Sequence, residues 1–118
     1  PRGDPAYPAA YPEVIAVAAV DARLRPYRRG TRGEYVEVAA PGVDIVSAGT
    51  GGGRQAWTGT SFAVPFAAAA LLRARAITRG DADAARRLLR EEARDLGAPG
   101  LDEIYGFGLV QSPGDRCW

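Results

Sequence analysis

The sequence contains no histidine and no lysine, and these two absences limit the chemistry that it can perform alone. A serine or cysteine nucleophile needs a base to take its proton near neutral pH, and histidine or lysine usually provides that base. All fifteen basic residues are arginine, which stays protonated in proteins and cannot act as the base. The chain as printed therefore cannot be a complete serine–histidine catalyst.

Cysteine, excess charge and long apolar runs are scarce as well. The single cysteine, Cys117, cannot form a disulfide within the chain, so we expect a free thiol, with pairing to a segment outside this sequence as the alternative. No apolar stretch reaches the roughly 18 residues of a membrane span, so we expect no such span, and the first residues do not resemble a signal peptide. The net charge of +1, with arginines scattered among acids, gives no reason to expect a nucleic-acid partner.

The sequence has the composition of a globular protein, with 47% hydrophobic and 25% charged residues in a length of about one domain. Residues 14–20 form a continuous apolar run, which predicts a strand buried on both faces, as in a parallel sheet covered by helices. Residues 34–48 alternate enough to predict two short strands, interrupted at Pro41 and Gly42. The glycine-rich residues 49–55 predict a turn or hairpin tip and lack the ending of a phosphate-binding loop.

Two helices are expected after these strands. Residues 61–77 are apolar on every side until the arginines near the end, which predicts a helix buried through the centre of a domain. Residues 81–96 predict a surface helix capped by Asp81 or Asp83, stopped at Gly97 and carrying a solvated face of arginine and glutamate. Residues 105–110 predict a short extended segment. These elements are too few to cover their own apolar surfaces, so we interpret residues 1–118 as part of a larger layered α/β domain.

Ser61 is the candidate nucleophile, because it stands between a Gly-Thr turn and the start of the apolar helix. Backbone N–H groups and the positive end of the helix dipole meet there, and both would stabilise a developing oxyanion. Pro65 has no N–H to donate to the carbonyl of Ser61, so either the first turn is loosened or the regular helix begins near Pro65. The alternative to a nucleophile is a helix cap, since Thr60 and Ser61 are both good capping residues.

Four segments resemble the carboxyl-terminal part of the catalytic domain of subtilisin-like serine proteases, the subtilases, in that family's order and spacing. They are YPAAYPEVIAVAAVD at residues 7–21, VAAPGVDIVS at 38–47, TGTSFAVP at 58–65 and YGFGLV at 105–110. The resemblance implies the carboxyl-terminal portion of a three-layer α/β fold with a mostly parallel sheet and a buried central helix that carries the serine. It implies a serine endopeptidase that acts on peptides or proteins, with a family-level expectation of secreted or periplasmic localisation.

In that family the catalytic residues follow the order Asp, His, Ser, and the first two precede the portion seen here. The resemblance therefore implies an upstream Asp- and His-bearing segment, in cis or as a separate chain, and an inactive 118-residue chain without it. Of the oxyanion hole, only the backbone N–H of Ser61 is carried over. The family usually has His where this chain has Phe66 and often Met where it has Phe62, and neither change removes the nucleophile.

The resemblance also implies binding roles for other residues. Trp57 would lie on the leaving-group side of the scissile bond, Thr60 would contact substrate, and Ala6 would lie near the floor of the pocket for the preceding side chain. No cofactor is required. The carbonyls of Ala9, Tyr11 and Val14, with the carboxylate of Glu37, match a position where some subtilases hold a weakly bound structural cation, calcium or monovalent. Tyr35 stands where another carboxylate often helps.

A non-catalytic alternative remains open from the sequence. It is a subtilase remnant that binds a protein partner through its glycine-rich loop and its Tyr-Pro segment, residues 7–12. The presence of Asp and His motifs in the upstream coding region would favour the enzyme, and their absence would favour the remnant.

Overall fold

Two parallel strands form the centre of the structure, a computed structural model that describes residues 4–111. Strand β1 (Ala16–Val20) pairs with β2 (Val36–Pro41), with Ala19 opposite Ala40. β1 falls within the apolar run 14–20 and β2 within the alternating segment 34–48, as predicted, and β2 is buried over its first five residues. Cys117 lies outside the described residues, so the prediction of a free thiol stays a prediction.

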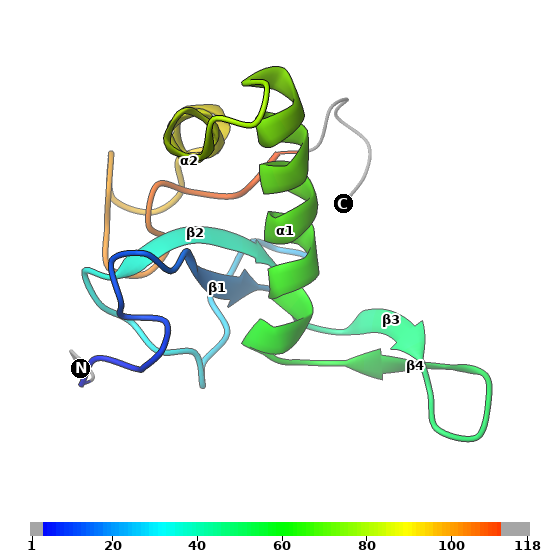
Figure 1. Cartoon of the computed structure of the whole chain (residues 1–118). Coiled ribbons are helices and arrows are strands. Elements are labelled where there is room, and N and C mark those ends of the chain that lie inside the picture. The colour runs from blue at the N-terminus through cyan, green and yellow to red at the C-terminus, as the bar shows by residue number, and fades with distance from the viewer. Residues whose placement is uncertain (1–3, 112–118) are drawn as a thin grey trace.

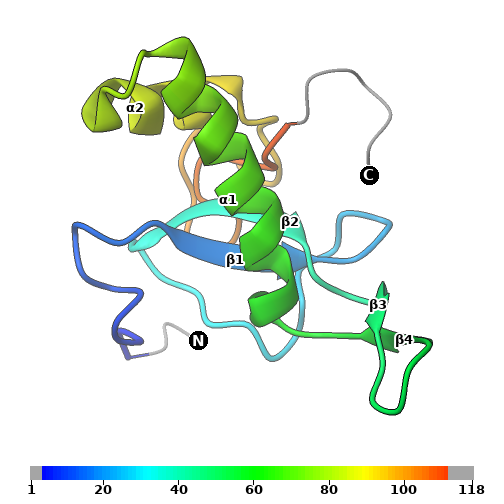
Figure 2. The same cartoon turned by 45° about the vertical axis from the view of Figure 1, so that its right-hand side comes forward.

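Helix α1 (Thr60–Ile77) crosses one face of this sheet (Figures 1 and 2). Its buried alanines, Ala63 and Ala67, join a core cluster with side chains from both strands, Ala19, Val38 and Ala40. Alanine at these positions lets the helix backbone approach the sheet closely, which excludes water from both. The predicted helix is thus confirmed, and it begins one residue before Ser61.

The outer face of α1 differs from the expectation of a fully buried helix. Val64, Leu72 and Ile77 are 48%, 71% and 54% exposed, and only three of its residues are buried. More of the apolar surface of α1 is exposed among the described residues than its sequence predicts. By length and composition α1 also passes for a membrane span, but a core helix passes the same test, and Ala63 and Ala67 pack on the sheet.

Helix α2 (Ala82–Glu92) packs beside α1. Asp81 is its N-cap, as predicted, and the Asp81 carboxylate accepts the backbone N–H of Ala84 at 2.9 Å. The helix buries Ala85 and Leu89. It ends before the predicted stop at Gly97, because the backbone of the following residues turns to pair with the carboxyl-terminal segment.

The segment 105–110 is extended only around Leu109, which forms isolated bridges with Ala39 of β2 and with Arg94. A Cβ atom at Gly106 would lie 2.2 Å from the carbonyl oxygen of Glu37, so only glycine fits this approach. Leu109 joins a second core cluster whose other members come from the strands and loops: Val20, Ala39, Ala18, Leu24, Leu96 and Tyr105. The second cluster is therefore built from strands and loops, without a side chain from α1 or α2.

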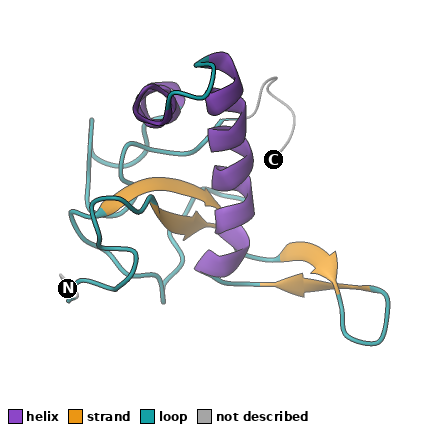
Figure 3. Ribbon diagram, in the orientation of Figure 1, coloured by secondary structure: helices purple, strands orange, loops and turns teal. Residues whose placement is uncertain are grey.

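Strands β3 (Ile45–Ala48) and β4 (Arg54–Trp57) form an antiparallel hairpin that projects from the body and leads into α1 (Figures 1 and 3). The break predicted at Pro41 and Gly42 falls at residues 42–44, because Pro41 still belongs to β2. Residues 49–53 form the tip, which confirms the hairpin interpretation of the glycine-rich stretch. The chain thus passes directly from an exposed hairpin to the helix that bears Ser61.

Candidate active site

The start of α1 lies at the carboxyl end of the parallel sheet. Gly42 follows the last residue of β2, and its carbonyl accepts the N–H of Gly59, the N-cap of α1, at 2.8 Å. In open α/β sheets, ligands bind outside the carboxyl ends of the strands. The fold therefore brings Ser61 to the edge where such sheets place their functional groups.

Glycine at position 42 permits this close contact. A Cβ atom there would lie 2.6 Å from the Cβ of Ala19, 2.8 Å from the carbonyl oxygen of Gly59 and 3.1 Å from the Cβ of Ala63. The first turn of α1 thus rests directly on the sheet. Backbone contacts, rather than long side chains, set the position of Ser61.

Ser61 is exposed, in the first turn of α1. No side chain caps the helix, and its first turn contains no acidic residue. The interpretation of Thr60 and Ser61 as capping residues is therefore wrong. The first N–H groups of a helix have no partner within the helix. Here the positive end of the helix dipole therefore lies beside the exposed Ser61.

Pro65 lies inside α1 rather than at its start. The structure therefore supports the first of the two predicted arrangements, in which the helix already includes Ser61 and the proline withholds one hydrogen bond from its carbonyl.

An aromatic pair borders Ser61. The rings of Trp57 and Phe62 stack with centroids 5.6 Å apart and an interplanar angle of 19°. The Trp57 indole N–H also donates to the carbonyl of Ala48 at 3.0 Å, which ties the pair to the hairpin. Trp57 thus stacks on a residue of the first turn of α1, the turn that also contains Thr60 and Ser61. Ala6 belongs to the segment before β1, and that segment lies apart from the start of α1 in both views (Figures 1 and 2).

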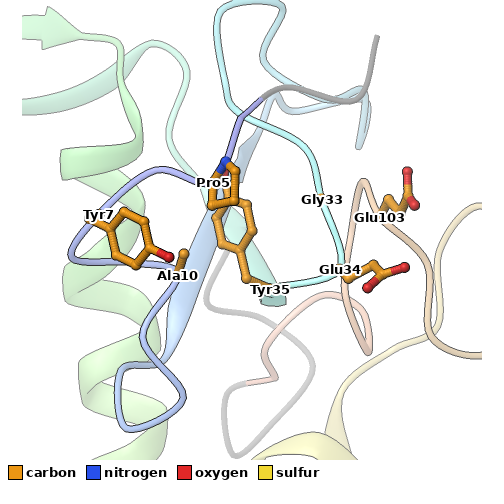
Figure 4. A pocket seen from close by; sticks show the side chains of 7 residues that line it. All are labelled: Pro5, Tyr7, Ala10, Gly33, Glu34, Tyr35 and Glu103. Atoms are coloured by element: carbon orange, nitrogen blue, oxygen red, sulfur yellow. The ribbon is translucent and has the colours of Figure 1, made fainter.

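A cavity of about 330 Å³ lies between the Tyr-Pro segment and residues 33–35. Figure 4 shows Glu34 and Glu103 on one side of it and Tyr7 and Ala10 on the other. The buried hydroxyl of Tyr35 has no hydrogen-bond partner in the described part of the chain. Neither Ala6 nor Ser61 lines this cavity, so it is separate from the exposed serine.

Two of the predicted cation ligands, Val14 and Glu37, accept hydrogen bonds from Arg86. Glu37 is 5% exposed, and its carboxylate accepts two hydrogen bonds from Arg86, Nε to Oε1 at 2.8 Å and Nη2 to Oε2 at 2.5 Å. Arg90 Nε donates to the same Oε1 at 2.7 Å. Arg86 also donates to the carbonyls of Pro12, at 2.8 Å, and Val14, at 3.4 Å.

These arginines were expected on a solvated face, and that expectation is wrong. Hydrogen bonding to Glu37 raises the pKa of Arg86 above its ordinary value, because the bonds favour the charged guanidinium. Arg86 and Arg90 each follow a buried residue of α2, Ala85 and Leu89, and stand one turn apart. That spacing was the available signal, but it could not reveal a carboxylate 49 residues earlier in the sequence.

Comparison with known proteins matches the chain to one family. A model of the subtilase family matches residues 3–108. The chain is 40% identical over 111 residues to the minor extracellular protease Epr of Bacillus subtilis, covering 89% of this chain and 16% of that protein. It is 39% identical to a thermostable alkaline protease of Halalkalibacterium halodurans, covering 90% and 29%, and 39% identical to subtilisin of Bacillus pumilus, covering 88% and 37%. The chain thus spans well under half of each of these relatives.

A solved structure supports the same fold. The crystal structure of fervidolysin from Fervidobacterium pennivorans, a keratinolytic enzyme related to subtilisin, superposes with a TM-score of 0.76 at 30% sequence identity. The match covers 89% of this chain and 19% of that one. The predicted α/β fold of a subtilisin-like domain is therefore confirmed for the portion present.

Proposed function

The chain belongs to the subtilase family, and from that premise we propose that it is the nucleophile-bearing part of a serine endopeptidase. In this proposal the Ser61 Oγ attacks a peptide carbonyl, a histidine from another segment takes the proton and later gives it to the leaving amine, and water hydrolyses the acyl-enzyme.

One observation carries the proposal: Ser61 is exposed at a helix start that no side chain caps. A tetrahedral intermediate places a negative oxygen beside the nucleophile, where the Ser61 backbone N–H and the helix dipole would stabilise it. A capped helix start would already have committed one or more of these donors. The uncapped start supports an acyl-transfer site at this position.

The histidine must come from outside the printed sequence, which contains none. We propose that an Asp- and His-bearing upstream segment supplies it, in cis or as a separate chain. The exposed apolar side chains of α1, Val64, Leu72 and Ile77, support a partner on that face. Among the described residues, β1 pairs along its length only with β2, so most of its other edge is also free for a strand.

The substrate contacts follow from the same proposal. The Trp57 and Phe62 stack, beside Ser61, would border the residue after the scissile bond, and Thr60 would contact the chain of the substrate. Ala6 would form the floor of the pocket for the preceding residue once the upstream segment adds its other walls. A family relative is extracellular by name, which supports a secreted or periplasmic protein.

Labelling with a fluorophosphonate probe tests the proposal. We expect Ser61 to be modified when the chain is combined with its own upstream segment, or with the amino-terminal part of Bacillus pumilus subtilisin, and not when the chain is alone. The matched variants are Ser61→Ala, which should abolish labelling, and Ser47→Ala, which removes an exposed serine from the hairpin and should preserve it.

Labelling that survives Ser61→Ala would contradict the assignment of the nucleophile. A combination that assembles by size-exclusion chromatography but shows no labelling would favour the alternative, a subtilase remnant that binds protein partners without catalysis.

A further inference from the structure

Three of the four ligands predicted for a structural cation, Tyr11, Val14 and Glu37, already accept hydrogen bonds from groups of the chain. The carbonyl of Tyr11 accepts the N–H of Val14 at 3.0 Å, and the carbonyl of Val14 accepts a hydrogen bond from Arg86. The carboxylate of Glu37 binds both Arg86 and Arg90. An ion at this place would therefore have to displace a guanidinium from the one buried carboxylate in the ligand set.

The charges also disfavour an added cation. The cavity here, of about 370 Å³, is lined by Tyr11, Val14 and Glu37 and also by Arg86 and Arg90. Glu34 also lines the cavity but is exposed, so the one buried carboxylate of the lining, Glu37, is shared by two guanidinium groups. Calcium prefers several oxygen ligands, and it is bound more weakly as carboxylates become fewer. Tyr35, where a second carboxylate would help, contributes no charge.

We propose that the Arg86 guanidinium is the built-in cation of this chain, taking the place of the metal ion that the resemblance implies. Its fork of donors satisfies Glu37 of β2 and the carbonyls of Pro12 and Val14 in the segment before β1. Arg86 thereby joins β2 and that segment, which are the parts that an ion held by the predicted ligands would join, and adds α2 to them.

Arg90 holds the same carboxylate from the second side. Its guanidinium carbon lies 5.1 Å from the ring centroid of Phe107, over the aromatic face. This contact keeps the Arg90 side chain in place while Nε binds Glu37. The raised pKa of Arg86 agrees with the arrangement, because a guanidinium that stays protonated acts as a permanent cation.

Urea denaturation of the 118-residue chain, in calcium and in a chelator, tests this proposal without reference to peptidase activity. We expect the same midpoint for the wild type in both conditions, and no heat of calcium binding by titration calorimetry up to about 1 mM, the range of weak extracellular sites. Arg86→Met should lower the midpoint, whereas Arg87→Met, at the exposed neighbouring arginine, should leave it unchanged.

Arg86→Lys separates charge from geometry, because lysine keeps the charge but lacks the planar fork. We expect its midpoint between those of the wild type and Arg86→Met. If Arg86→Met does not fold, that result supports the proposal in the same way as a lowered midpoint, because Arg87→Met controls for the loss of an arginine.

Two results would overturn the proposal. The first is calcium binding by the wild type that disappears in Glu37→Gln, which would place an ion on the carboxylate despite Arg86. The second is an Arg86→Met midpoint no lower than that of Arg87→Met.

Discussion

The two ends of the central sheet differ in how far the chain completes them. At the carboxyl end, Ser61 is exposed, and α1, the helix that bears it, also has exposed apolar side chains. At the amino end, the arginine cluster, which consists of Glu37, Arg86 and Arg90, is closed by hydrogen bonds within the chain. The difference separates the end of the sheet that this chain closes by itself from the end that it leaves open.

The largest expected effect concerns the open end. The chain alone should hydrolyse a peptide substrate at a negligible rate, and addition of the upstream segment should raise the rate by several orders of magnitude. In subtilisin, a relative, loss of the catalytic histidine or serine costs about 10⁶-fold in kcat. Initial rates with a chromogenic peptide check this, with Ser61→Ala as the control. Equal activity of the chain with and without that segment would break the comparison.

A smaller effect is expected where the open end meets the sheet. Gly42→Ala should destabilise the fold by about 1–3 kcal/mol, because its Cβ would overlap Ala19 and the Gly59 carbonyl. It should also lower kcat in the complemented enzyme by moving the first turn of α1. Denaturation and steady-state kinetics measure the two effects. Gly49→Ala is the control, since its Cβ would meet only the flexible end of Gln55.

If a partner binds the outer face of α1, a substitution on that face should weaken binding without changing the stability of the chain. Leu72→Ser should change the stability of the chain by less than about 0.5 kcal/mol, as exposed sites usually do. It should weaken association with the upstream segment by about tenfold or more, since burial of a leucine contributes about 1.5–3 kcal/mol. Leu101→Ser, at an exposed leucine outside α1, is the matched control. Equal binding by both variants would argue against this face as the interface.

The smallest effect concerns an ion pair at the surface. The Asp21 carboxylate accepts hydrogen bonds from the backbone N–H and from the side chain of Arg25. These bonds lower the pKa of Asp21 below the ordinary 3.8. A lowered folded-state pKa adds stability above the unfolded pKa, and this stability is lost as pH falls through the folded value. Asp21→Asn should therefore flatten the pH dependence of stability below about pH 4. An unchanged acid limb in that variant would contradict the assignment.

The sequence predicted the elements better than their surroundings. The apolar run of β1 and the Asp81 cap of α2 are local signals, and both elements formed where expected. The outer face of α1 was misjudged because hydrophobicity reflects the final environment of a helix, and the described chain supplies only part of that environment. The early end of α2 depends on Arg94 pairing with Leu109, a long-range contact that local pattern does not encode.

The same division applies to the candidate site. Ser61 was singled out by its local motif, and its exposure agrees with the proposed role. The arginine cluster was missed, because Arg86 and Arg90 look like ordinary surface charges until β2 brings Glu37 against them. Roles that depend on an absent wall, such as that of Ala6, stay predictions, since one chain segment cannot define a pocket that several segments share.

The hairpin tip offers a place to attach a reporter. Gly51, Gly52 and Gly53 each face open space, with no atom within 4 Å of the position that a Cβ would occupy. A short peptide tag inserted among them would displace no neighbouring atom, while the strand pairs below it would keep Trp57 in position. A fluorophore carried there would report the proposed assembly in real time from a point next to the serine-bearing helix, without occupying the outer face of α1, where we propose that a partner binds.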